Sequence, residues 1–249
     1  MSIPDLTRVT TLLLDADGTL FPSEEPAFDA SAVVTRDFAR SFGLTGDLSP
    51  ENLRRTTTGM NFRSTARMLA ERQGVHLGAD RLEEWVEREK NEVTAHLGHV
   101  LTPRQDVLGA LSALRGRYRL AVVSSSALTR LAACFGASGL DRLLPAECRF
   151  SAEDSLPRPT SKPDPAIYRF ALTRLGLAPH QALALEDSAT GAASAVAAGV
   201  ATAGLVQFVP DAERAERAGQ LRDAGAAWVR RSWDEVVSDL VGNTSRVVT

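Results

Sequence analysis

Hydrophobic and polar residues alternate along the chain in blocks whose lengths and periods indicate both strands and helices. Residues 9–14 form an apolar run of the kind that is buried on both faces of a parallel sheet. Strand signals return at 118–126 and 182–185, and helical patterns occur at 165–175 and 190–198. A further apolar run at 200–206 is followed by a charged helical stretch and by the residues "AAWVRR" at 226–231. This alternation predicts right-handed crossovers and a parallel sheet that carries helices on both faces.

A second pattern, purely helical, occupies the chain from about residue 28 to residue 97. Apolar residues recur there at spacings of three and four and form one stripe: Leu82, Trp85, Val86, Val93 and Leu97. Short proline-bearing stretches at 21–26 and 98–103 border the block, as is typical of linkers. We therefore expect an α/β core, residues 1–21 and 100–249, interrupted by a helical cap, residues 22–99.

Composition limits the classes of protein to consider. The 249 residues are 44% hydrophobic and 24% charged, which is typical of a soluble globular protein. The formal net charge is −3, so no basic excess indicates binding to nucleic acid or to acidic lipid. Two cysteines without paired spacing, no long apolar run and no signal-peptide pattern favour a reducing, cytoplasmic setting away from the membrane. Whether the protein is a monomer or a homodimer stays open.

Polar residues that could take part in catalysis or binding follow several of the predicted strands. They are Asp15 and Asp17 after the first strand, Ser124 after the second, Glu186 and Asp187 after the run at 182–185, and Lys162 in the loop between. In an open parallel sheet, ligands bind beyond the carboxyl ends of the strands. We therefore expect these side chains to gather at one edge of the sheet.

Each of these stretches also has a purely structural explanation. The "DGT" at residues 17–19 is a common turn, and serines after a strand often cap the next helix. The "KPDP" at 162–165 can be only a helix start, and "LEDS" at 185–188 an acidic N-cap. Because all four occur in this order after sheet elements, a shared site is the stronger interpretation.

Together, "DADGT", Ser124, "SKPDP" and "LEDS" resemble the motifs of the haloacid dehalogenase-like (HAD) superfamily of hydrolases. The resemblance covers nearly the whole chain and implies a Rossmann-like α/β core. The helical insertion is similar to the C1 cap of the subgroup that includes phosphoglycolate phosphatase and β-phosphoglucomutase.

The resemblance implies a magnesium centre. Two carboxylates as close as Asp15 and Asp17 repel each other unless a cation lies between them or one is protonated, and Mg²⁺ prefers such oxygen ligands. The ligands implied are Asp15, Asp187 and the backbone carbonyl of Asp17, with Glu186 supporting the site.

The resemblance also implies catalytic roles. Asp15 would attack phosphorus and form an aspartyl-phosphate, and Asp17 would act as general acid and then as general base. Phosphate oxygens would be held by Ser124, by Ser125 and by Lys162, while Thr19 orients the nucleophile loop. The loop before Lys162, residues 151–160, is longer than usual and either shapes the pocket or is a surface excursion.

The second aspartate separates the possible reactions. Haloacid dehalogenases lack it, because a leaving halide needs no proton, so Asp17 favours a phosphate ester. We expect a phosphatase for a small phosphorylated metabolite, such as a sugar phosphate or a phosphoglycolate-like acid. A sugar-phosphate mutase and a catalytically inactive HAD-like binding protein are the alternatives. In the cap, Gly59 and Arg63 belong to a stretch similar to the family's substrate-specificity loop, although Arg63 lies one place from the residue that supplies a mutase's arginine.

Overall fold

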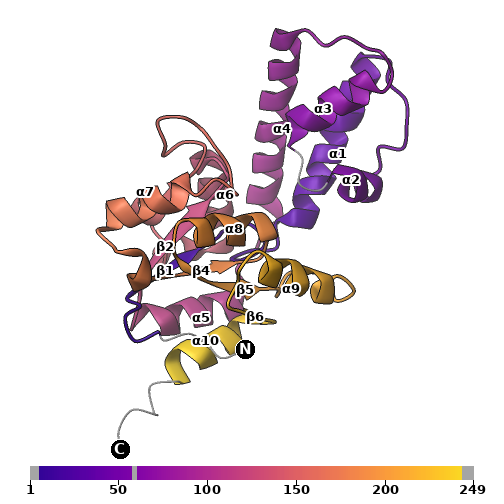
Figure 1. The fold of residues 1–249 in the computed structure, drawn as a ribbon. Helices are drawn as coiled ribbons and strands as arrows, with labels where there is room; N and C mark the ends of the chain where they lie inside the picture. Colours follow the sequence, from indigo (N-terminus) through magenta and orange to yellow (C-terminus); the bar gives the residue numbers. More distant parts are fainter. Residues whose placement is uncertain (1–5, 58–60, 243–249) are drawn as a thin grey trace, which may run out of the picture. The chain divides into compact units, whose positions relative to one another are not determined.

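The structure is a computed structural model that describes residues 6–57 and 61–242. The chain divides into two compact units, one made of Met1–Pro22 with Leu101–Thr249 and the other of Ser23–Val100 (Figure 1). Within the part of the chain that the structure describes, no helix combines the length and apolar character that crossing a membrane requires.

The first unit contains a six-stranded parallel sheet in the order β3-β2-β1-β4-β5-β6. The strands are β1 (Thr11–Leu14), β2 (Arg119–Ser124), β3 (Arg149–Ser151), β4 (Ala182–Glu186), β5 (Ala201–Leu205) and β6 (Trp228–Arg230). The parallel α/β fold predicted from the sequence is confirmed. The direction of strand addition reverses beside β1, between β1 and β4, which is where open sheets of this order bind ligands.

Burial explains why β1 has so uniform a composition. Leu12, Leu13 and Leu14 are all inaccessible to solvent, because β1 lies between two strands and under helices on both faces. The strand begins two residues later than the apolar run predicts. The three-residue strand β3 is not among the strands that the sequence predicts, because three residues are too few to show a period.

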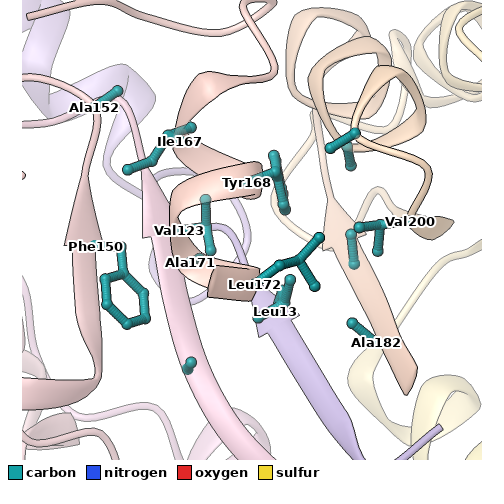
Figure 2. Close-up of a cluster of buried hydrophobic side chains, with 14 residues drawn as sticks. Leu13, Val123, Phe150, Ala152, Ile167, Tyr168, Ala171, Leu172, Ala182 and Val200 are labelled. Atoms are coloured by element: carbon teal, nitrogen blue, oxygen red, sulfur yellow. The ribbon is translucent and has the colours of Figure 1, made fainter. Parts of the chain in front are cut away.

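Helices cover both faces of the sheet. They are α5 (Gln105–Arg115), α6 (Leu128–Ser138), α7 (Ala166–Leu175), α8 (Ala189–Ala197), α9 (Arg214–Asp223) and α10 (Trp233–Gly242). Helices α5 and α10 pack together on the face opposite α7 and α8 (Figure 1). Figure 2 shows how α7 lies on the sheet, with Ile167 and Leu172 among Leu13, Val123 and Phe150.

The long loop between β3 and α7 is folded back on itself rather than extended. Thr160 N–H donates to the carbonyl of Ala152, and Ser155 Oγ accepts from Ser151 N–H. The Asp154 carboxylate accepts from Leu128 N–H at 2.6 Å and so caps the start of α6. This loop therefore fixes the position of α6, a role that the sequence does not reveal.

The second unit is helical, with α1 (Glu24–Ser41), α2 (Pro50–Thr57), α3 (Phe62–Glu71) and α4 (Ala79–Val100). Phe38 lies at the centre of its core, with Phe62 and Trp85 packed edge-on at 5.9 and 5.8 Å between ring centroids. The predicted stripe on α4 is buried except for Val86, which is partly buried.

Candidate active site

The candidate site lies at the carboxyl ends of β1, β2 and β4. The parallel register places Leu14 beside Val122 on one side and Leu185 on the other, so the residues that follow these strands meet. Asp15 extends the ladder by one step, since its N–H donates to the carbonyl of Leu185 at 3.0 Å.

Three buried carboxylates gather there. Asp15, Glu186 and Asp187 each offer an oxygen, and these oxygens lie within 4.8 Å of one another. Glu186 is fully buried, and Asp15 and Asp187 are each 7% exposed. Burial raises the pKa of Asp15, and the Lys162 ammonium opposes that rise. So much buried negative charge is stable only with cations beside it.

Lys162 supplies one of those cations. Its Nζ donates to Asp15 Oδ1 at 2.6 Å, to Glu186 Oε1 at 2.6 Å and to the carbonyl of Val123 at 2.7 Å. Burial alone would lower the pKa of Lys162, but the two carboxylates raise it above its ordinary value. The ammonium is therefore charged, and all three of its protons have acceptors.

Glu186 has one satisfied oxygen and one unsatisfied oxygen. Oε1 accepts from Lys162 and also from the hydroxyl of Tyr168 on α7, whereas Oε2 is buried with no hydrogen-bond partner among the described residues. Burial raises the pKa of Glu186 to about 7, against the opposing effect of Lys162. Tyr168 is fully buried, and burial raises its pKa well above the ordinary value, so the phenol donates.

Two glycines bring the backbone against these acids. A Cβ on Gly191, in the first turn of α8, would overlap Glu186 Oε2, and one on Gly18 would overlap the Asp187 carboxylate. Gly18 also has φ +77°, a left-handed conformation that favours glycine. Arg217 on α9 lies on the far side of Asp187, with its Nη1 3.7 Å from Asp187 Oδ2.

The cluster fits a hard divalent cation such as Mg²⁺. Its donors are all carboxylate oxygens, the set that Mg²⁺ and Ca²⁺ prefer. Glu186 Oε2, which is buried and has no hydrogen-bond partner in residues 6–57 and 61–242, is the kind of atom that a bound ion satisfies.

The Asp17 carboxylate has partners other than those of the acidic cluster. Its Oδ2 accepts from Ser126 Oγ at 2.6 Å, and its Oδ1 from Arg130 Nη2 at 3.1 Å. The turn that carries it is closed by Gly18 N–H, which donates to the carbonyl of Phe21. Trp233, at the start of α10, also fixes the turn, since its Nε1 donates to the carbonyl of Thr19.

The remaining predicted residues of the core unit lie beside this site. Ser124 Oγ accepts from Ser126 N–H, and Ser125 Oγ accepts from Lys162 N–H, which ties the end of β2 to the lysine loop. The Thr19 hydroxyl is buried and has no hydrogen-bond partner within the described segments. The predicted residues of the core unit thus lie at the ends of the central strands and on the adjoining loops: Asp15, Asp17, Ser124, Ser125, Lys162, Glu186 and Asp187.

The two other predicted site residues, Gly59 and Arg63, belong to the cap. Gly59 lies outside the described residues. Arg63 is on α3 of the second unit, where its guanidinium pairs with both oxygens of Glu83 on α4. Its contact with substrate stays a prediction.

Several residues of the site were not found from the sequence. Tyr168, Arg130, Arg217 and Trp233 each belong to a helix or turn that is brought to the site only by folding. Gly191 carried a weak signal, since a glycine in the first turn of a helix directly after two acids indicates a close backbone approach.

The parallel sheet and the buried acidic cluster at the ends of its central strands define a doubly wound α/β protein with a candidate cation site. A model of the haloacid dehalogenase-like hydrolase family matches residues 9–199. The chain therefore belongs to this family of hydrolases and is an enzyme.

Solved structures agree with this assignment. A HAD family hydrolase from Deinococcus radiodurans R1, solved with bound phosphate and sodium, is 27% identical (94% of this chain, 96% of that one, TM-score 0.67). A predicted phosphoglycolate phosphatase from Haemophilus somnus 129PT is 22% identical (94% and 99%, TM-score 0.72). CbbY from Rhodobacter sphaeroides in complex with xylulose 1,5-bisphosphate is 22% identical (91% and 96%, TM-score 0.69). No curated protein sequence matches the chain significantly.

Proposed function

We propose that this protein is a Mg²⁺-dependent phosphatase that hydrolyses a small phosphomonoester through an aspartyl-phosphate on Asp15. The observation that carries the proposal is the arrangement of the two aspartates. Asp15 lies in the buried acidic cluster beside Lys162, whereas Asp17 is held apart by Ser126 and Arg130. This difference in partners supports Asp15 as the attacking carboxylate and Asp17 as the group that transfers a proton.

Asp15, Asp187 and Glu186, with the backbone carbonyl of Asp17, are the residues we propose to hold the metal. When bound, Mg²⁺ supplies positive charge against the oxygens of the transferring phosphoryl group. Glu186 Oε2 supports this set, since it is a carboxylate oxygen that is already desolvated and has no partner among the residues that the structure describes.

In the first step, an Asp15 carboxylate oxygen bonds to phosphorus and the bond from phosphorus to the ester oxygen breaks. Asp17, in its acid form, gives its proton to that departing oxygen, so an alcohol leaves and Asp17 becomes a carboxylate. Lys162 holds Asp15 Oδ1 in place for the attack and adds positive charge beside the phosphoryl group.

In the second step, water attacks phosphorus and releases the Asp15 carboxylate. Asp17 takes a proton from that water and returns to its acid form, and inorganic phosphate leaves. Ser124, Ser125 and Thr19 are the further residues that we propose to bind phosphate oxygens or to orient the loop. The buried Thr19 hydroxyl, for which the described residues offer no partner, supports its inclusion.

The substrate that we propose is a small phosphorylated metabolite, such as a sugar phosphate or a phosphoglycolate-like acid. Two relatives of the same fold were solved with phosphate or with a sugar bisphosphate, which supports this choice. We propose that Gly59 and Arg63 of the 22–99 cap contact the part of the substrate beyond the phosphate. We further propose a cytoplasmic protein, monomeric or homodimeric, without nucleic-acid or membrane partners.

The test is phosphate release from a panel of sugar phosphates, phosphoglycolate and nucleotides, with Mg²⁺ and with chelator. Release that depends on Mg²⁺ and is lost in Asp15→Asn supports the proposal. Release that is unchanged by chelator contradicts the metal assignment. No release, together with isomerisation of β-glucose 1-phosphate, would instead indicate the mutase.

A further inference from the structure

Both carboxylate oxygens of Asp17 are bound by one short segment of the chain. Ser126 Oγ donates to Oδ2 at 2.6 Å, and Arg130 Nη2 donates to Oδ1 at 3.1 Å. The two side chains of the ion pair are 26% and 29% exposed, so the pair is mostly desolvated yet open to a ligand. Neither Ser126 nor Arg130 has a role in the two steps proposed above.

The segment that presents these donors is held firmly. Arg130 is the third residue of α6, whose first turn is capped by Asp154 through Leu128 N–H. Ser126 is held by its own N–H, which donates to Ser124 Oγ at 3.0 Å. Because both donors have fixed backbones, they restrict Asp17 to one side-chain orientation.

The surroundings explain why such restraint matters. Asp15 is two residues away, and the Asp15 and Asp17 carboxylates repel each other. Lys162 is bound to Asp15 and Glu186. Asp17 is paired with a different cation, Arg130.

We propose that Arg130 and Ser126 are the positioning residues of Asp17, an inference that rests on the proposed function. When Asp17 gives its proton to the departing ester oxygen, it becomes a carboxylate with two oxygens to satisfy. Ser126 Oγ–H and Arg130 Nη2–H are aimed at those two oxygens. The pair thus stabilises the product of the proton transfer and holds Asp17 ready to take a proton from water.

The choice of leaving group separates this role from a merely structural one. An alkyl phosphate has a poor leaving group that needs the proton, whereas p-nitrophenolate leaves with little help. In Arg130→Met, we expect kcat/KM for an alkyl phosphate to fall about 10- to 100-fold, part of the usual acid–base contribution. For p-nitrophenyl phosphate we expect a loss of less than about threefold, because the positioned acid contributes little there.

Three further variants complete the test. Ser126→Ala should show the same substrate pattern more weakly, and Arg130→Lys should recover part of the alkyl phosphate activity, since it restores the charge but not the planar fork. Arg174→Met, which removes an exposed arginine of α7, is the matched control and should leave both rates unchanged. In an Asp17→Asn background, Arg130→Met should lower neither rate further, because the two residues act as a unit.

The outcomes are distinguishable. Equal losses on both substrates, unchanged rates, or fully additive losses with Asp17→Asn would each overturn the role of Arg130. If Arg130→Met does not fold, Ser126→Ala decides the same question. If the wild-type protein releases phosphate from neither substrate in Mg²⁺, the proposed function itself is overturned, and the role of Arg130 with it.

Discussion

Lys162 Nζ lies 2.6 Å from Asp15 Oδ1, although 147 positions separate the two residues in the sequence. The same ammonium reaches Glu186 Oε1 and the end of β2. The two acids follow adjacent central strands, and Lys162 arrives on the loop between β3 and α7. Their contact therefore depends on the strand order and links the fold directly to the site.

Replacing that lysine should damage both activity and stability. In Lys162→Met, Asp15 and Glu186 lose their shared buried cation, so we expect the free energy of unfolding to fall by about 3–5 kcal/mol. Phosphatase activity should fall at least about 100-fold, because positioned charge at the reacting group is lost. Urea unfolding and phosphate release measure the two effects. The chain's other lysine, Lys90, provides the control: Lys90→Met should keep activity, and equal losses in both variants would contradict the assignment.

Gly191 should tolerate no larger side chain. In Gly191→Ala the new methyl group overlaps Glu186 Oε2, and Glu186 cannot move without losing Lys162 or Tyr168. We expect weaker Mg²⁺ binding, measured by calorimetry, and a large loss of activity. Gly109→Ala is the matched control, since Gly109 is also inside a helix but has open space around it. That variant should be stabilised by roughly 0.5–1 kcal/mol with unchanged activity.

The Tyr168 hydroxyl should tune the metal site without being a ligand. Tyr168→Phe keeps the ring and removes the donor to Glu186 Oε1. Because partners that orient metal ligands usually contribute 10- to 100-fold in affinity, we expect Mg²⁺ affinity to fall about tenfold. Tyr118, the other tyrosine, donates to the carbonyl of Leu240 and is buried as well. Tyr118→Phe should therefore lose about 1 kcal/mol of stability with unchanged Mg²⁺ affinity, and a Tyr168→Phe protein with unchanged affinity would refute this role.

The buried Glu186 should also make the metal-free protein sensitive to pH. Burial raises its pKa to about 7, so the folded state favours the protonated form. The resulting stability is fully present below the ordinary value of 4.5 and is lost as pH rises through about 7.

Between pH 4.5 and about pH 7, the free energy of unfolding of chelator-treated wild type should fall by about 3 kcal/mol relative to that of Glu186→Gln. Denaturant unfolding at several pH values measures the difference between the two proteins. Parallel stability curves for wild type and Glu186→Gln would contradict the raised pKa of Glu186.

The acidic residues of the site could be predicted because local sequence carries their signal. Asp15, Ser124 and Glu186 each stand where an apolar run ends, and parallel strands bring such ends to one edge. The partners of these residues could not be predicted in the same way. Arg130 and Tyr168 are ordinary residues of amphipathic helices, and only the packing of α6 and α7 turns them toward Asp17 and Glu186.

One further difference has an equally physical cause. Strand β3 is too short for periodicity to reveal, and it is buried through pairing with β2 rather than through its own composition. The contact of Arg63 with substrate stays a prediction, made from its place in a motif. Arg63 forms an ion pair with Glu83, which joins α3 to α4. The two residues are twenty positions apart in the sequence, so a local motif does not encode this contact.

The central claim, that Asp15 is the nucleophile, is tested most directly by detecting its phosphorylated form. Asp17→Asn slows attack by water, while p-nitrophenyl phosphate needs little acid to react, so the intermediate should accumulate. Acid quenching and peptide mass spectrometry should then find one phosphoryl group on Asp15 with Mg²⁺ and none with chelator. A protein that releases phosphate in Mg²⁺ while Asp15 is never phosphorylated, or an Asp15→Asn variant of full activity, would contradict the account.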